Sequence, residues 1–547
     1  MHGALLAFAL AMPIQDVPHA GHAEPPGDPV PLYDNLGDHH YEISTSVPKA
    51  QAYFDQGLRL YYAFNHQEAI RSFREAQRLD PDCAMCWWGE SLAWGPNINL
   101  PMDSAAGVAA YVAVQGAVAV QDGETELERA LIDALVARYD ADPPEDRARL
   151  DSAYAAALAE AVERFPNDIE VAVLYGESLM DLRPWNYWTE TGEPYPGTTE
   201  SLAQFERVSA RNPNHPGACH FFIHTVEAVD PDRAVPCAER LAGLMPGAGH
   251  LVHMPGHIYI RVGRYADAIR ANEHAVHADE TWIQDQRPGA GVYTAGYYPH
   301  NYDFLAFAAT MAGRRALAVE AADKVASLIP EELLRAPGMG FLQHWLGRPL
   351  QVRVRFGLWD EILEAPAPPA DLAHSRAFWH YARGRAFSAR GDAGAAAEEL
   401  VALRAAAHDP SLESLSMEFN ESRAILAIAE SVLAARVAAA RGNDDEAIAL
   451  LRDAVRLEDG LTYGEPPEWT VPVRHDLGAV LLAAGLPAEA ESVYREDLER
   501  FRDNGWSLIG LAQALRAQGK TAEAAAVEAR FEAAWETADV EPSTSSF

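Results

Sequence analysis

Histidine and acidic residues gather in one stretch of the sequence, between Cys219 and Asp303. The spacing of His220, His224 and Glu227 is i, i+4, i+7, and the spacing of His250, His253 and His257 is i, i+3, i+7. On an α-helix, each set forms a single stripe. If the two helices are neighbours, five imidazoles and a carboxylate face one space. Such a space suits a transition metal, or an anionic or aromatic ligand.

We therefore predict a metal site. Its predicted ligands are His220, His224, His253 and His257. Four more residues are predicted as ligands or as groups that hold the ligands: Glu227, His250, His300 and Asp303. Glu177 is a further candidate carboxylate, and Tyr259, Tyr293, Tyr297 and Tyr298 are candidate hydrogen-bonding or redox-active phenols.

The donor types narrow the choice of metal. Imidazoles bind zinc, copper and iron, at about 2.0–2.1 Å for zinc. Two histidines with one carboxylate and an open position suit non-haem iron, whereas an all-histidine set suits copper. The region lacks a set of thiolates, so we expect copper or iron ahead of zinc. The sequence has no HExxH, GxSxG, P-loop or GxGxxG motif in its required context, so a metal-dependent oxidoreductase is one interpretation and catalysis stays open.

The elements that must position these residues are paired helices. In "YFDQGLRLYYAFNHQEAIRSFREAQRLDP", Gly57, Ala69, Phe73, Ala76 and Pro81 have the spacing of the tetratricopeptide repeat, which the segment closely resembles. Similar units recur through most of residues 50–535. The resemblance implies an all-α fold, a right-handed superhelical TPR-like α-solenoid of helix hairpins. Small residues let the helices approach, large ones fill the next groove, and proline ends the second helix.

The same resemblance implies where the histidines point. Ligands of tetratricopeptide proteins bind mostly to the first helix of each hairpin, at its second, fifth and ninth places. His250, His253 and His257 take those places in one unit, and His220, His224 and Glu227 take the fifth, ninth and twelfth of the unit before. Further residues fall on this stripe in other units: Cys83, Cys86, Glu90, Glu177, Asp181, His300, Asp303, His344 and His475. Pro255 predicts a kink that can displace His250.

The chain divides into six predicted segments. They are a possible signal peptide (1–23), an extended tether (24–49) that contains His39 and His40, N-terminal repeats (50–280), an inserted loop (281–298), C-terminal repeats (299–535) and a disordered tail (536–547). Other insertions at 95–107, 181–199 and 460–472 are rich in aromatic residues, proline and glycine, and can form a lid.

Composition restricts the partners and the compartment. A net charge of −37 argues against nucleic acid. The apolar run "GALLAFALAM" is too short to span a bilayer and suits export to the periplasm or outside the cell, although a basic region before it is missing. No later stretch predicts a membrane span. Cys83 and Cys86 form a weak CxxC signal, and burial is favoured over pairing for Cys219 and Cys237.

Two alternatives to a metal site remain. One is a non-catalytic scaffold whose groove binds a peptide or protein partner. Grooves of this family that hold acidic peptide ends are lined by Lys, Arg and Asn, whereas this one has His, Glu and Asp, apart from Arg261 and Arg355. The other is a metal-free pocket for a small-molecule substrate, in which neutral histidines donate hydrogen bonds or act as acid and base.

Overall fold

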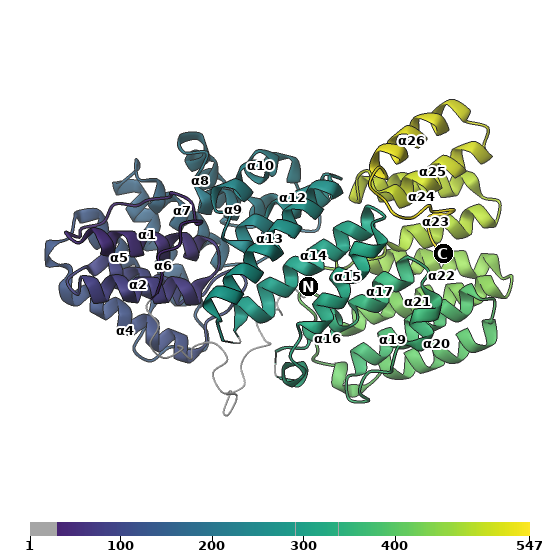
Figure 1. The fold of residues 1–547 in the computed structure, drawn as a ribbon, viewed down its shortest axis with the longest axis horizontal. Helices are drawn as coiled ribbons and strands as arrows, with labels where there is room; N and C mark the ends of the chain where they lie inside the picture. Colours follow the sequence, from purple (N-terminus) through teal and green to yellow (C-terminus); the bar gives the residue numbers. More distant parts are fainter. Residues whose placement is uncertain (1–29, 290, 337) are drawn as a thin grey trace. The chain divides into compact units, whose positions relative to one another are not determined.

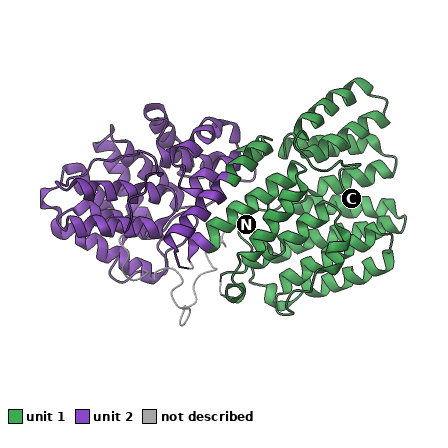
Figure 2. Cartoon of the chain, viewed as in Figure 1, with its two compact units in different colours: residues 1–15, 259–273, 295–547 green, residues 16–258, 274–294 purple. Residues whose placement is uncertain are grey.

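The computed structural model describes residues 30–547 except 290 and 337. The predicted signal peptide and residues 24–29 of the predicted tether lie outside the described residues. The described part of the chain is helical, with isolated bridges in place of strands. It divides into two compact units (Figure 2). The N-terminal unit contains residues 30–258 and 274–294, and the C-terminal unit contains residues 259–273 and 295–547.

The N-terminal unit is a stack of helix hairpins (Figure 1). Its helices are α1 (Pro48–Tyr62), α2 (His66–Leu79), α3 (Ala84–Ala93), α4 (Ser104–Val120), η1 (Gln121–Gly123), α5 (Glu126–Arg138), α6 (Ala148–Arg164), α7 (Ile169–Asp181), α8 (Thr198–Arg211), α9 (Pro216–Val226), η2 (Pro231–Ala234), α10 (Val235–Leu244) and α11 (Gly249–His253). The division between the units falls within α12 (Pro255–Arg261), α13 (Tyr265–Gln286) and η3 (Tyr293–Tyr297).

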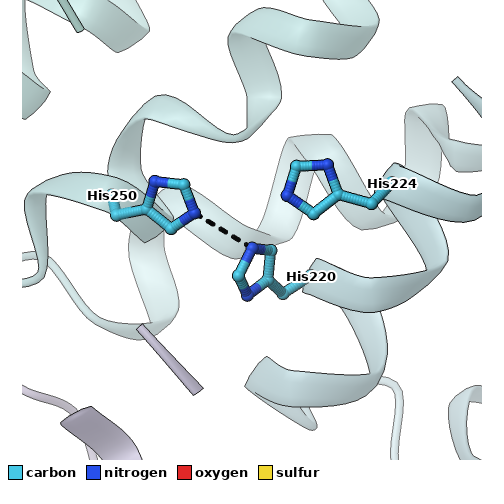
Figure 3. Close-up of side chains that lie close together, drawn as sticks. All are labelled: His220, His224 and His250. Atoms are coloured by element: carbon cyan, nitrogen blue, oxygen red, sulfur yellow. Dashed lines mark hydrogen bonds between the residues drawn. The ribbon is translucent and has the colours of Figure 1, made fainter. Parts of the chain in front are cut away.

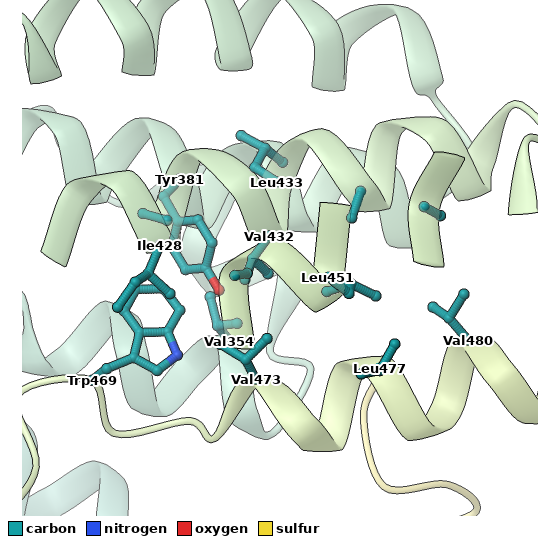
Figure 4. Close-up of a cluster of buried hydrophobic side chains, with 14 of the residues drawn as sticks. Val354, Tyr381, Ile428, Val432, Leu433, Leu451, Trp469, Val473, Leu477 and Val480 are labelled. Carbon is teal, nitrogen blue, oxygen red and sulfur yellow. The ribbon is translucent and has the colours of Figure 1, made fainter. Parts of the chain in front are cut away.

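The C-terminal unit repeats the hairpin arrangement. Its helices are α14 (Tyr298–Met311), α15 (Arg315–Ser327), η4 (Glu331–Arg335), α16 (Phe341–Leu346), α17 (Arg348–Arg355), α18 (Trp359–Glu364), α19 (Ala373–Ala389), α20 (Ala393–Ala407), η5 (Pro410–Leu412), α21 (Ser422–Ala440), α22 (Asp444–Asp459), α23 (Val473–Ala483), α24 (Pro487–Arg500), α25 (Gly505–Ala517) and α26 (Thr521–Ala534). Aliphatic residues such as Val432, Leu451 and Leu477 fill the space between successive hairpins, with Trp469 at one end (Figure 4).

Glycine and aromatic residues set the spacing of the hairpins. A β-carbon at Gly57 would lie 2.6 Å from the Phe73 ring, and one at Gly89 would lie 2.3 Å from it. Phe73 therefore fills the space between α1 and α3, where a larger residue than glycine would clash. In the C-terminal unit, Tyr494 occupies the same place between two glycines of α23 and α25. This packing confirms the predicted TPR-like hairpin fold.

The predicted tether and inserted loop differ in the structure. Residues 30–47 lack regular secondary structure, as predicted, but they pack against the first hairpin. The Tyr33 hydroxyl donates to Glu68, and Leu36 and Ile43 are buried. The predicted loop at 281–298 is largely helical, because α13 continues to Gln286 and η3 follows at Tyr293–Tyr297. Neither segment carries the Ala-rich helical periodicity of the repeats, so the sequence pattern did not reveal their packing.

The structure also differs from two further predictions, one about the C-terminal tail and one about membrane-spanning stretches. Residues 536–547, predicted as a disordered tail, lie against the C-terminal unit, where the Trp535 indole donates to the Val540 carbonyl. In the described chain, Ser104–Gly123 is long and apolar enough to cross a membrane, contrary to the expectation that no later stretch is. Length and composition alone are weak evidence, and the α4 part of this stretch packs against α3.

Candidate metal centre

Helices α9 and α11 bring three histidines together in the N-terminal unit (Figure 3). His220 and His224 lie one turn apart on α9, and His250 lies on α11. Each side chain is at most 3% exposed. The Nε2 atoms of His220 and His250 are 3.1 Å apart, and one ligand atom from each histidine lies within 4.8 Å of the others. The i, i+4 stripe predicted for α9 therefore faces the neighbouring helix.

Hydrogen-bond acceptors determine which nitrogen of two rings carries the proton. His220 Nδ1 lies 2.7 Å from the Tyr62 carbonyl oxygen, which can only accept, so this nitrogen is the N–H. His224 Nδ1 lies 3.2 Å from the Glu227 carboxylate, and the same reasoning applies. In a neutral imidazole the other nitrogen then holds a lone pair. His220 and His224 therefore both present the Nε2 lone pair, which is the form that binds a metal.

The Nε2 atom of His224 has no hydrogen-bond partner. It is buried, and neither a backbone group nor a side chain in the described chain satisfies it. A buried polar atom without a partner costs about 1–3 kcal/mol. This atom is therefore the clearest candidate in the cluster for binding a ligand.

Glu227, at the C-terminal end of α9, holds two imidazoles at once. One oxygen accepts from His224 Nδ1, and the other lies 2.6 Å from Nδ1 of His257. His257 thus also presents its Nε2, which is 2.8 Å from Nε2 of His253. Because both oxygens of Glu227 accept from ring N–H groups, Glu227 orients the two imidazoles, and the predicted alternative in which Glu227 itself binds a metal is not favoured.

Burial keeps the imidazoles of α9 neutral. The pKa of His224 is lowered to about 3 because the buried ring cannot hold a charge that water would stabilise. The pKa of His220 is held well below its usual range, first by burial and then by the nearby His224. Neutral imidazole is the form in which histidine binds metals.

Two aromatic residues enclose the cluster. Phe64, in the turn between α1 and α2, has a φ of 55°, a left-handed value that is unusual for a bulky residue. Its ring lies 5.2 Å from that of His250 and 4.5 Å from that of His220. Trp185 lies 5.0 Å from His224 and donates to the Asn99 side chain. The 95–107 and 181–199 insertions therefore meet beside His224.

The remaining predicted site residues are placed as follows. Pro255 ends α11 and starts α12, yet His250 stays within the cluster, contrary to the expected displacement. His300 lies on α14 in the C-terminal unit, with its ring 5.0 Å from that of Phe304. Both oxygens of Asp303 accept from Arg348, at 2.7 and 2.9 Å, so this carboxylate is already paired with a cation.

Several other predicted groove residues have structural partners. Glu177 accepts from the Tyr61 hydroxyl at 2.6 Å. The Tyr293 hydroxyl donates to Asp279. Cys83 and Cys86 form a disulfide, whereas Cys219 and Cys237 are buried thiols, as predicted.

A second group in the N-terminal unit, His39, Glu170 and His215, also brings one possible ligand atom from each residue within 4.8 Å of the others. His215 Nδ1 accepts from the Ala218 backbone N–H, so its proton is on Nε2 and points at Glu170, 3.0 Å away. A protonated Nε2 cannot bind a metal. His39, from the segment predicted as a tether, lies 2.8 Å from the same carboxylate, and His40 pairs with Asp55.

In the C-terminal unit, His344 and His374 form a buried pair. His344 Nε2 donates to the Glu468 carbonyl oxygen at 2.8 Å, and its Nδ1 accepts from His374 Nε2 at 3.0 Å. His374 Nδ1 then accepts from the Ser422 hydroxyl at 2.7 Å. Every ring nitrogen of this pair has a partner of the opposite kind. His475, another predicted groove residue, pairs with Asp497.

Comparisons with known proteins concern the fold. A human IFIT1 dimer with m7Gppp-AAAA is 13% identical, with 89% of this chain and 90% of that chain covered and a TM-score of 0.30. The yeast Tom70 crystal structure is 12% identical, with coverages of 87% and 90% and a TM-score of 0.27. The TPR domain of P58(IPK) is 11% identical, with coverages of 86% and 99% and a TM-score of 0.22. Such low TM-scores support no inference about a ligand.

No curated protein matches the chain. Residues 50–83 match the family model described as the tetratricopeptide repeat. This match covers most of α1, all of α2 and the turn into α3, the hairpin whose Gly57 and Phe73 carry the resemblance in the sequence.

Proposed function

We propose that the N-terminal unit binds a transition metal ion through Nε2 of His220 and His224 together with His250. The observation that carries this proposal is the buried Nε2 of His224, which has no hydrogen-bond partner. Beside it lies Nε2 of His220, which also holds a lone pair because the His220 proton is on Nδ1. An ion at this point takes up both lone pairs and removes the cost of the unsatisfied atom.

The spacing of the histidines supports this proposal. Two nitrogens bound at 2.0–2.1 Å to a tetrahedral ion lie roughly 3.3 Å apart. The 3.1 Å between Nε2 of His220 and Nε2 of His250 is close to that value. Because the His220 Nε2 atom holds a lone pair, His250 Nε2 donates the hydrogen bond between them. An ion therefore replaces this hydrogen bond, and the proton of His250 moves to its Nδ1. The acceptors behind the rings, the Tyr62 carbonyl and the Glu227 carboxylate, are the groups that commonly hold metal-binding histidines.

The donor set favours copper over iron. Non-haem iron needs a carboxylate ligand, but the Glu227 oxygens already accept from two ring N–H groups. Three imidazoles remain, a set that suits copper or zinc, and copper binds nitrogen ligands more tightly. We therefore propose copper as the preferred ion. An oxidoreductase activity would require an open ligand position at this ion and stays a prediction.

A thermal titration tests metal binding. Tag-free protein stripped of metal is unfolded by heat with and without Cu²⁺ or Zn²⁺, alongside the variants His224→Gln and His374→Gln. Metal at 100 times its Kd stabilises a folded protein by about 2.7 kcal/mol. We expect this stabilisation in the parent and in His374→Gln, and its loss in His224→Gln.

His374→Gln is the matched control because both histidines are buried and each sits in a hydrogen-bonded histidine group. Equal metal stabilisation of the parent and His224→Gln would overturn the site. No stabilisation of the parent by either ion would leave the chain with the second interpretation, a scaffold of TPR-like hairpins that binds a peptide or protein.

A further inference from the structure

The segment after α26 returns to the C-terminal unit and crosses the first helices of its hairpins. Asp539 caps the start of α15 by accepting from the backbone N–H groups of Arg315 and Ala316. The chain then continues to α23, and its end is marked beside this helix in Figure 1. Ser545 and Ser546 are buried there. We call residues 543–547 the returning segment.

Side chains of three different helices hold the backbone of the returning segment. Gln513 of α25 donates to the Ser543 carbonyl at 2.8 Å, and Arg355 of α17 donates to the Ser545 carbonyl at 2.8 Å. Arg385 of α19 donates to the Phe547 carbonyl at 3.3 Å. Carbonyls at every second residue are thus bound, which is how an extended peptide is recognised independently of its side chains.

The side chains of the returning segment are also recognised. The Ser545 hydroxyl donates to the His475 carbonyl at 2.8 Å and lies 2.7 Å from the Tyr494 hydroxyl. The Ser546 hydroxyl donates to Asp476 at 2.8 Å and accepts from Arg436. The Phe547 ring lies edge-on to Trp506, at 6.2 Å between centroids. These contacts select two small hydroxyl residues followed by an aromatic one.

The residues that contact the segment are already held by one another. Asp476 is paired with Arg385 at 3.0 Å and also with Arg436. Arg355 stacks over Trp506, 3.6 Å from the ring centroid. These contacts do not involve the returning segment and orient the residues that bind it, and a preorganised surface loses little entropy when a ligand binds.

We propose that the first-helix face of α17, α19, α21, α23 and α25 is a peptide-binding site, which the returning segment occupies as an internal ligand. A partner of the same chemistry, an extended segment with two small hydroxyl residues before an aromatic residue, binds there by displacing it. An attached ligand has an effective concentration in the mM range, so the returning segment keeps out weaker partners.

A displacement experiment tests this site with the full chain. The probe is a fluorescein-labelled peptide of residues 541–547, added to the parent and to a variant in which Ser545, Ser546 and Phe547 are all replaced by Ala. Removal of the internal ligand's contacts frees the site, so we expect the peptide to bind the variant at least tenfold more tightly than the parent. A labelled peptide with the same three replacements is the control and should bind neither protein.

Equal binding of the peptide to both proteins, or no binding to either, would show that the returning segment is only a structural part of the unit. A second measurement avoids dependence on the folding of the variant. In the parent, a saturating amount of unlabelled peptide should raise hydrogen exchange in residues 539–547, whereas unchanged exchange would contradict displacement.

Discussion

Each unit of the chain buries a group of histidines, and the two groups differ in their protons. In the C-terminal unit, each nitrogen of His344 and His374 has a hydrogen-bond partner, and the chain of bonds ends on the Ser422 hydroxyl and the Glu468 carbonyl. In the N-terminal unit, the acceptors behind His220 and His224 fix both N–H groups on the far side of the rings. The lone pairs then face inward, and one of them has no partner.

This difference teaches that burial and the number of histidines do not define a metal site. Burial lowers the pKa of both His224 and His374 to about 3, so both are neutral. What separates them is the direction of the hydrogen bonds. His215 gives the same lesson within the N-terminal unit, because the Ala218 N–H fixes its proton on the nitrogen that faces the carboxylate.

Among the substitutions that test this difference, Glu227→Gln is expected to lower metal affinity most. The amide has one acceptor oxygen and one donor nitrogen, so it cannot accept from the N–H groups of His224 and His257 together. Loss of a group that orients ligands costs about 10–100-fold in metal affinity. A titration against a chromogenic chelator measures this affinity. Unchanged affinity would show that Glu227 does not hold the tautomers.

Ser422→Ala in the C-terminal unit is expected to have a smaller effect, which is on stability and not on metal affinity. This change leaves His374 Nδ1 without the donor that now satisfies it, and a buried acceptor without a partner costs about 1–3 kcal/mol. The midpoint of urea unfolding should fall, while the chelator titration should give the parent's metal affinity. A metal that binds more tightly to this variant would mean that His374 can also form a metal site.

Part of the fold and of the site was predictable from residue spacing. The hairpins follow from the glycine, alanine and aromatic positions around Gly57 and Phe73, and the packing of Phe73 confirms them. The shared face of His220 and His224 follows from helical periodicity. These are local signals, which one helix or one hairpin carries by itself.

The groups that decide the chemistry left no such signal. The acceptor for His220 is a backbone carbonyl, Tyr62, which any residue would supply. Phe64 gave a weak signal, a bulky residue in the turn between two helices. Asp303 fell on the predicted ligand stripe, but Arg348 pairs with it through a contact between separate hairpins. The returning segment belongs to the predicted disordered tail. Its partners Arg355 and Arg385 are far away in the sequence, so no local pattern indicates that it packs.

Elemental mass spectrometry tests the metal site most directly. The parent, His220→Gln, His224→Gln and His374→Gln are produced without a tag and purified without chelator or nickel resin. We expect one transition metal ion per chain, copper ahead of zinc, in the parent and in His374→Gln, and none in His220→Gln or His224→Gln. A parent without metal, or equal metal in all four proteins, would contradict the assignment of His220, His224 and His250 as a metal centre.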